Sequence, residues 1–133
     1  MSFILGCNIQ STGGKERMKR ILVVEDEDRI RHIYTKFLTE EGFDVIETSN
    51  AVDAYDVLVR DKVDLVLLDI KMPQIEGNLL YEILHSFHIN NSVLVASVYP
   101  VEVQKRLVPG ARDYYDKSHG IEVLLDKIKK ILV

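Results

Sequence analysis

The sequence has few of the features that mark secreted, membrane or nucleic-acid-binding proteins. It contains one cysteine, Cys7, so no internal disulfide can form, and a reducing, cytoplasmic setting fits best. No apolar run is long enough to cross a membrane, and the apolar N-terminal stretch lacks the basic leader and the length of a signal peptide. The formal net charge is −4 and the basic residues form no stripe, which argues against direct binding of nucleic acid.

Length and composition indicate one globular domain. The 133 residues suit a single domain, and 47% hydrophobic with 29% charged residues is an ordinary globular balance. Residues 1–17 include Ser11-Thr12-Gly13-Gly14, a flexible composition, and Met18 directly precedes the first strong strand pattern. We therefore predict a flexible extension over 1–17 and a folded domain over 18–133. A short native extension that is partly ordered is the alternative.

From Lys19 onward, short apolar β-branched runs alternate with amphipathic stretches of helical spacing, which is typical of a repeating βα fold. The strands are expected at 21–24, 44–48, 63–68, 93–96 and 112–116. The second is the least apolar and suits a sheet edge, whereas the third is almost uninterrupted and suits a central parallel strand. Right-handed crossovers then favour a doubly wound α/β fold: a five-stranded parallel sheet in the flavodoxin-like order 2-1-3-4-5, with helices on both faces.

Five amphipathic stretches predict the helices between and after these strands. Gly42 ends the first, and Ser49 or Asn50 caps the second. A third follows Gly77, and the fourth is confined to the few residues between Pro100 and Pro109-Gly110. The last carries a clear apolar stripe that comprises Ile121, Leu124, Leu125, Ile128, Ile131 and Leu132.

Polar residues follow the predicted strands at the edge where such folds bind ligands. They are Glu25 and Asp26 after the first strand, Asp69 after the third, Ser97 after the fourth and Lys117 after the fifth. Three carboxylates at one edge repel one another, so a cation is expected among them. Oxygen ligands alone favour a hard cation such as Mg²⁺, and Lys117 supplies a second positive charge.

A carboxylate beside a cation can act as a nucleophile that accepts a phosphoryl group. Asp69 is the best candidate because it is the lone acid at the end of the central strand, and Ser97 can donate a hydrogen bond to a phosphoryl oxygen. Taken singly, each residue has a structural interpretation, and Glu25 and Asp26 in particular suit the acidic start of a helix. The joint placement at strand ends favours a site. The histidines His32, His85, His88 and His119 show no metal or catalytic spacing.

Four segments of the sequence resemble the receiver domains of bacterial response regulators. They are residues 21–27, residues 64–73, Gly77 and residues 110–114, and the resemblance extends over about residues 19–133. It implies that a sensor histidine kinase or a phosphotransfer protein phosphorylates Asp69, and that the phosphorylated domain changes its binding to a downstream protein target.

The resemblance also implies a role for each site residue. Asp26 and Asp69 would bind Mg²⁺ directly, Glu25 would bind it through water, and the backbone carbonyl of Lys71 would complete the protein ligands. Lys117 and Ser97 would contact the phosphoryl group.

Within the same resemblance, Ser97 and Tyr114 occupy the places of the switch residues that move on phosphorylation. Tyr114 is chosen by its position relative to Lys117, and its neighbour Tyr115 is the alternative.

The sequence departs from the usual receiver pattern at two places. Ser118 replaces the proline that usually follows the active-site lysine, and the segment from Ser97 to Lys117 is shorter than usual.

Two other functions are compatible with these residues. A degenerate receiver would keep the acids but serve only as a binding scaffold, without phosphorylation. An aspartate-nucleophile phosphohydrolase would also use Asp69 and Mg²⁺, but such enzymes place an acid two residues after the nucleophile, where this chain has Lys71. A signalling module that acts only on its own phosphorylation is therefore preferred over an enzyme. Whether the chain is free-standing or part of a larger regulator is left open.

Overall fold

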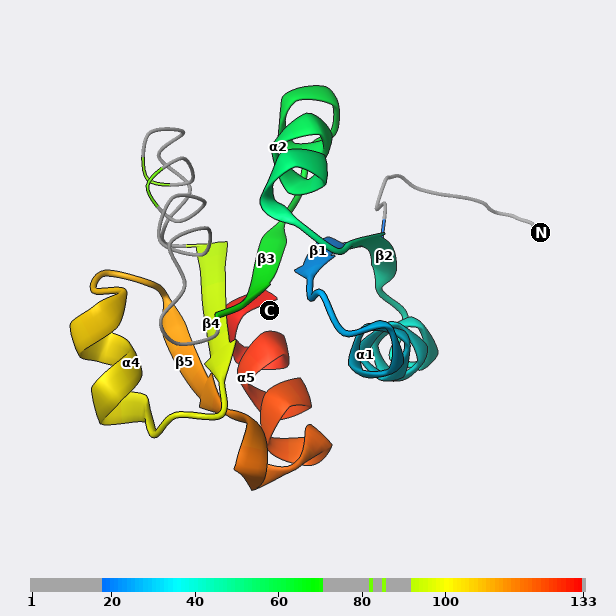
Figure 1. The fold of residues 1–133 in the computed structure, drawn as a ribbon. Coiled ribbons are helices and arrows are strands. Elements are labelled where there is room, and N and C mark those ends of the chain that lie inside the picture. Colours follow the sequence, from blue (N-terminus) through cyan, green and yellow to red (C-terminus); the bar gives the residue numbers. More distant parts are fainter. Residues whose placement is uncertain (1–17, 71–81, 83–84, 86–91, 133) are drawn as a thin grey trace.

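Five parallel strands form one sheet in the computed structural model, which describes residues 18–70, 82, 85 and 92–132 (Figure 1). The strand order is β2-β1-β3-β4-β5, and every neighbouring pair is parallel. The predicted fold and strand order are therefore confirmed. The strands are β1 (Arg20–Val24), β2 (Asp44–Thr48), β3 (Leu65–Asp69), β4 (Val93–Ser97) and β5 (Asp113–Asp116).

Helices cover both faces of the sheet (Figure 1). They are α1 (Asp28–Glu40), α2 (Ala51–Arg60), α4 (Val101–Leu107) and α5 (Ile121–Leu132), with a 3-10 turn, η3 (Lys117–His119), before α5. The helix predicted after Gly77 lies outside the described residues apart from Glu82 and His85, which are helical and exposed. In the described part of the chain, no helix has the length and hydrophobicity needed to span a membrane.

The central strands are buried on both faces, as their continuous apolar runs predict. Alternate residues of β1, β3 and β4 contribute to two separate cores. One core lies under α2 and also contains Val108 and Tyr114, and the other lies under α1 and α5 and contains Tyr115. The edge strand β2 is only partly buried over most of its length, in agreement with its weaker apolar pattern.

Local sequence signals fix the ends of several elements. Gly42 adopts a φ of 94°, which few residues other than glycine tolerate, two residues after α1 ends. The Asn50 side chain accepts a hydrogen bond from the Asp53 N–H at 2.9 Å, so Asn50 rather than Ser49 caps α2. Pro100 directly precedes α4, as predicted.

The third strand begins later than the apolar run predicted. It starts at Leu65 rather than Val63, because the Asp64 carboxylate accepts a hydrogen bond from the Arg20 N–H at 2.7 Å. Asp64 also donates its own N–H to the Arg20 carbonyl at 2.8 Å. These contacts join the chain to the start of β1 before regular β3 pairing begins.

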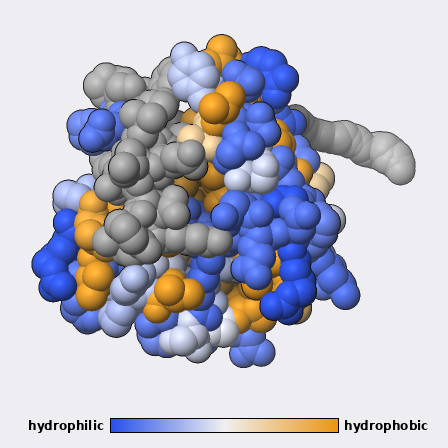
Figure 2. Space-filling view, viewed as in Figure 1, coloured by the Kyte–Doolittle hydropathy of each residue, from blue (hydrophilic) through white to orange (hydrophobic). Residues whose placement is uncertain are grey.

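Large apolar side chains are also exposed on the outer side of α2. They are Val52, Tyr55 and Val59. Figure 2 shows hydrophobic residues over α2, near the top of the view, among hydrophilic ones. The three residues are neighbours at steps of three and four residues, and their exposure does not alter the assignment of the core.

Candidate functional site

The carboxyl ends of β1, β3 and β5 bring three charged side chains together. The Lys117 Nζ lies 2.6 Å from Asp69 Oδ1 and 3.0 Å from Glu25 Oε1. The first contact is an ion pair, and in the second Lys117 donates a hydrogen bond to Glu25. The side chains of Glu25 and Asp69 are only 1% and 4% exposed, and that of Lys117 is 17% exposed. The predicted convergence of these three residues is therefore observed.

Asp26 completes a group of carboxylates with the geometry of a cation site. Glu25, Asp26 and Asp69 each offer one oxygen, and these oxygens lie within 4.8 Å of one another. Asp26 is exposed, so the group opens toward solvent at this residue. The donors are all carboxylate oxygens, the ligands that suit Mg²⁺ better than a softer metal. Among the residues that the structure describes, only these three form such a group, and it includes no histidine.

Burial sets the electrostatics of the site. Desolvation raises the pKa of Asp69 to about 7, and Glu25 adds to this rise while the Lys117 ammonium opposes it. Burial lowers the pKa of Lys117, but the Asp69 and Glu25 carboxylates outweigh it, so the net pKa of Lys117 is raised. Two buried carboxylates therefore share one partly buried ammonium, an arrangement that favours the uptake of a further cation or a proton.

Ser97 ends β4 and is fully buried. Its Oγ accepts a hydrogen bond from the Tyr99 N–H at 3.2 Å. Alternation along β4 places Ser97 on the same face of the sheet as Val95, whose partner on β5 is Tyr114. Ser97 and Tyr114 therefore share the face that α2 covers.

The two adjacent tyrosines lie on opposite faces of the sheet. The Tyr114 hydroxyl donates to the Val108 carbonyl at 2.5 Å and accepts from the Ala111 N–H at 3.1 Å. The Tyr115 hydroxyl instead donates to the Gly120 carbonyl at 2.6 Å, next to the start of α5. Both rings are buried, and Tyr114 is the one that shares a face with Ser97.

Ser118 makes contacts that a proline could not make. The Asp116 Oδ1 accepts from the Ser118 N–H at 2.9 Å and from its hydroxyl at 2.7 Å. The Ser118 hydroxyl and N–H lower the pKa of Asp116 below its usual value. Proline has no N–H to donate, so this cap on η3 depends on the serine. The sequence departure thus has a local structural role.

One predicted site residue, Lys71, lies outside the part of the chain that the structure describes. Its carbonyl was expected to bind the metal. His88 also lies outside the described residues. His32 lies near Glu47 at 3.5 Å and His119 near Asp116 at 3.6 Å, so neither joins the carboxylate group. His85 is exposed.

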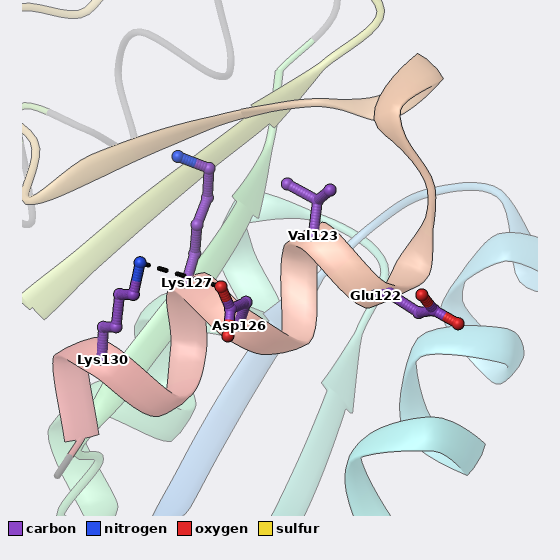
Figure 3. A pocket seen from close by; sticks show the side chains of 5 residues that line it. All are labelled: Glu122, Val123, Asp126, Lys127 and Lys130. Carbon is purple, nitrogen blue, oxygen red and sulfur yellow. Dashed lines mark ion pairs between the residues drawn. The ribbon is translucent and has the colours of Figure 1, made fainter.

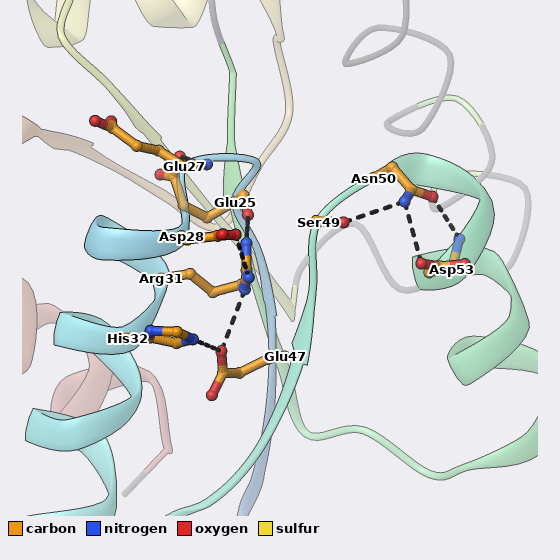
Figure 4. Close-up of polar contacts among 9 residues, drawn as sticks. All are labelled: Glu25, Glu27, Asp28, Arg31, His32, Glu47, Ser49, Asn50 and Asp53. Atoms are coloured by element: carbon orange, nitrogen blue, oxygen red, sulfur yellow. Dashed lines mark hydrogen bonds and ion pairs between the residues drawn. The ribbon is translucent and has the colours of Figure 1, made fainter.

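Arg31 holds the acidic loop after β1, and its importance was not evident from the sequence. Its Nη1 donates to the Glu25 carbonyl oxygen at 2.8 Å and its Nη2 to Asp28 at 2.6 Å. Its Nε donates to Glu47 on β2 at 3.2 Å, so one guanidinium ties the loop to two elements (Figure 4). The only sequence signal is an arginine three residues after an acid on the same helix.

Replacement of Arg31 by methionine is expected to weaken Mg²⁺ binding about tenfold, because residues that orient metal ligands typically contribute at that level. The change frees the Glu25 carbonyl and lets the loop that carries Glu25 and Asp26 move. Isothermal titration with MgCl₂ would measure the affinity. Arg29→Met removes an exposed arginine of the same helix and is the matched control. Equal affinities for the two variants would contradict a role for Arg31 in the site.

A surface hollow, away from the Asp69 site, lies on the outer side of α5. It is lined by Glu122, Val123, Asp126, Lys127 and Lys130 (Figure 3). Lys130 lies 3.7 Å from Asp126, and Lys127 lies 3.2 Å from Asp113 on β5. Its lysines are thus paired with nearby acids on the surface, and it lacks the buried, unequally matched charges of the Asp69 site.

Comparisons with known proteins agree with this geometry. The family model described as the response regulator receiver domain matches residues 21–129. The chain is 34% identical over 120 residues to the chemotaxis protein CheY of Treponema pallidum, covering 85% of this chain and 82% of the relative. It is 28% identical over 118 residues to sporulation initiation phosphotransferase F of Bacillus subtilis, covering 86% and 94%.

Solved structures give the same result. The response regulator TrrA of Thermotoga maritima, determined in complex with Mg²⁺-BeF, has a TM-score of 0.75 and 32% identity, covering 86% of this chain and 99% of that one. TrrA has also been determined in complex with the histidine kinase ThkA. Some other relatives are longer: the chain spans about half of the transcriptional regulatory proteins YxdJ and SrrA. The chain belongs to the response regulator receiver domain family.

Proposed function

We propose that Asp69 is the phosphoacceptor of this receiver domain. The observation that carries the proposal is the buried Asp69 carboxylate, 2.6 Å from the Lys117 ammonium and grouped with Glu25 and Asp26. In the reaction, an Asp69 oxygen attacks the phosphorus of a phosphohistidine or of a small acyl phosphate. The bond from phosphorus to the leaving nitrogen or oxygen breaks, and its electron pair leaves with that atom.

The group formed by Glu25, Asp26 and Asp69 fits Mg²⁺, because it offers only carboxylate oxygens and opens to solvent at Asp26. We assign Asp26 and Asp69 as direct ligands and Glu25 as a ligand through water, with the Lys71 carbonyl completing the set. When bound, the ion neutralises charge on the transferred phosphoryl group. The complex of the related response regulator TrrA with Mg²⁺-BeF supports this choice.

Lys117 and Ser97 would contact the phosphoryl oxygens. The Lys117 ammonium already lies beside the Asp69 oxygen that would carry the phosphoryl group, so little rearrangement is needed to neutralise it. The Ser97 hydroxyl can donate to a phosphoryl oxygen while its oxygen still accepts from Tyr99. We infer that Ser97 and Tyr114, which share a sheet face, form the switch, because phosphorylation adds charge and acceptors next to Ser97.

The partners follow from the proposed reaction. A sensor histidine kinase or a phosphotransfer protein would supply the phosphoryl group, and the complex of the related TrrA with its histidine kinase supports this. A downstream protein would recognise the phosphorylated form. The domain would then act as a cytoplasmic signalling module and would catalyse only its own phosphorylation and dephosphorylation.

The proposal is tested by the intact mass of the protein after incubation with acetyl phosphate and Mg²⁺. A gain of one phosphoryl group is expected, and it should disappear when EDTA removes the metal. Borohydride reduction of the acyl phosphate followed by peptide mapping should then find the reduced residue at position 69. Modification at another acid would contradict the assignment of Asp69.

The scaffold interpretation predicts a different outcome of the same experiment. It predicts no gain in mass even though calorimetry shows that Mg²⁺ binds and circular dichroism shows that the protein is folded. That result would reject phosphorylation as the function, and the protein would then be studied as a binding partner only.

A further inference from the structure

Gln104 is a fully buried polar residue on α4, outside the charged cluster, and is 0% exposed. Its side-chain nitrogen donates to the Tyr99 carbonyl at 2.7 Å and to the Tyr115 carbonyl at 2.9 Å. Tyr99 belongs to the segment between β4 and α4, and Tyr115 belongs to β5. One side chain of α4 therefore joins two other parts of the domain.

The chemistry of the two partners fixes the orientation of the Gln104 amide. Both are backbone carbonyls, which only accept hydrogen bonds, so the NH₂ group must face them. Among the described residues, the buried Gln104 Oε1 has no hydrogen-bond partner. A buried acceptor without a partner is destabilising, a cost that an apolar side chain would avoid. The two hydrogen bonds that the amide donates to the Tyr99 and Tyr115 carbonyls offset this cost.

The two acceptors of Gln104 lie close in the chain to Ser97 and Lys117, the residues proposed to contact the phosphoryl group. The backbone N–H of Tyr99 donates to Ser97 Oγ at 3.2 Å, while the Tyr99 carbonyl, which belongs to the next peptide unit, accepts from Gln104. Tyr115, the other acceptor, lies on β5, two residues before Lys117, which begins η3 directly after that strand. A continuous set of hydrogen bonds thus runs from the Ser97 hydroxyl through Gln104 to β5.

We propose that Gln104 is a positioning residue that couples α4 to the phosphoryl site, by holding the Tyr99 carbonyl near Ser97 and the Tyr115 carbonyl of β5 near Lys117. The inference rests on the proposed function of Asp69. If Ser97 shifts toward a phosphoryl group, the Tyr99 N–H that donates to its Oγ moves with it. The backbone of Tyr99 then shifts, and its carbonyl moves relative to the Gln104 amide. Because Gln104 is part of α4, the helix follows the state of the site.

The test compares the response of α4 in the wild type and in Gln104→Met, which keeps the side-chain length but has no donor. Backbone amide shifts would be recorded by NMR in Mg²⁺ before and after addition of beryllofluoride, a stand-in for the phosphoryl group. In the variant, shift changes over Val101–Leu107 are expected to fall at least about threefold, while amides near Asp69 still respond. Val57→Ala, a buried truncation on α2, controls for loss of stability alone.

A second readout uses the wild type and does not depend on a variant that folds. The side-chain NH₂ resonances of Gln104 should shift when beryllofluoride binds, since one of their acceptors moves. Unchanged resonances, or a full α4 response in Gln104→Met, would overturn the coupling alone. The absence of any response near Asp69 in the wild type would overturn the proposed function, and the coupling with it.

Discussion

Asp69→Asn is expected to abolish phosphorylation and, at the same time, to stabilise the metal-free protein by about 1–3 kcal/mol at pH 8. The first effect follows because an amide is not a nucleophile for phosphoryl transfer. The second follows because the Asp69 carboxylate is buried, 4% exposed, beside the buried carboxylate of Glu25. The Lys117 ammonium can satisfy only part of this negative charge, and asparagine removes one carboxylate while leaving Lys117 its hydrogen bond to Glu25.

The gain in stability should depend on pH in a defined direction. The pKa of Asp69 is raised to about 7 by burial, well above its value in an unfolded chain. The folded state therefore binds this proton more tightly than the unfolded state does. The free energy of unfolding of the wild type includes this favourable protonation at low pH, and it loses it as the pH rises from about 4 to about 7. Asparagine does not titrate. The two proteins should have similar stability near pH 4 and diverge toward pH 8.

Urea unfolding followed by circular dichroism in EDTA, at several pH values between 4 and 8, would measure this difference. Asp56→Asn, which removes an exposed carboxylate of α2, is the matched control and should change the free energy of unfolding by less than about 0.5 kcal/mol. Added Mg²⁺ should stabilise the wild type more than Asp69→Asn. If Asp69→Asn is instead less stable than the wild type at pH 8, the prediction is wrong. The Lys117 ammonium would then fully offset the cost of burying the Asp69 carboxylate.

The sheet could be predicted from the sequence because its signals are local. The apolar runs of β1, β3 and β4 exceed what a half-exposed strand would carry, so burial on both faces followed directly. Gly42 and Pro100 fixed helix ends for stereochemical reasons that depend little on the rest of the fold. The late start of β3 was missed because it depends on Asp64 meeting Arg20, a contact between residues far apart in the chain.

The convergence of the charged residues was predicted, but their burial and energetics were not. Strand-end positions identified Glu25, Asp69 and Lys117, since parallel strands end at one edge. That Glu25 is almost fully buried and bonded to Lys117 could not be foreseen, because the two residues are 92 positions apart and the surrounding atoms determine the burial.

Gln104 illustrates the same limit on another element. Its spacing from the inward-facing Val101 and Val108 indicates a core position, but nothing local shows that its amide would bridge two carbonyls. Polar residues at apolar positions of a short helix are therefore the places where sequence reasoning most needs a structure.

Lys117→Met is expected to destabilise the metal-free protein by about 2–4 kcal/mol at pH 8, because it leaves two buried carboxylates without their cation. The cost should be smaller at pH 5, where Asp69 can take up a proton and relieve the repulsion from Glu25. Mg²⁺ should bind the variant more tightly than the wild type, since the competing ammonium is gone. Phosphorylation should nevertheless fall, because the positive charge beside the phosphoryl oxygens is lost.

The matched control is Lys127→Met, which breaks a lysine–carboxylate pair of similar length, since Lys127 Nζ lies 3.2 Å from Asp113 Oδ2 on the surface. Surface pairs contribute about 0–1 kcal/mol, so this variant should remain close to the wild type. In the Asp69→Asn background, Lys117→Met should cost about 1–2 kcal/mol less than it does alone, because only Glu25 is then left unpaired. If Lys117→Met and Lys127→Met lower the free energy of unfolding equally, water already screens the charges of the Asp69 site. The stability gain expected of Asp69→Asn would then be wrong as well.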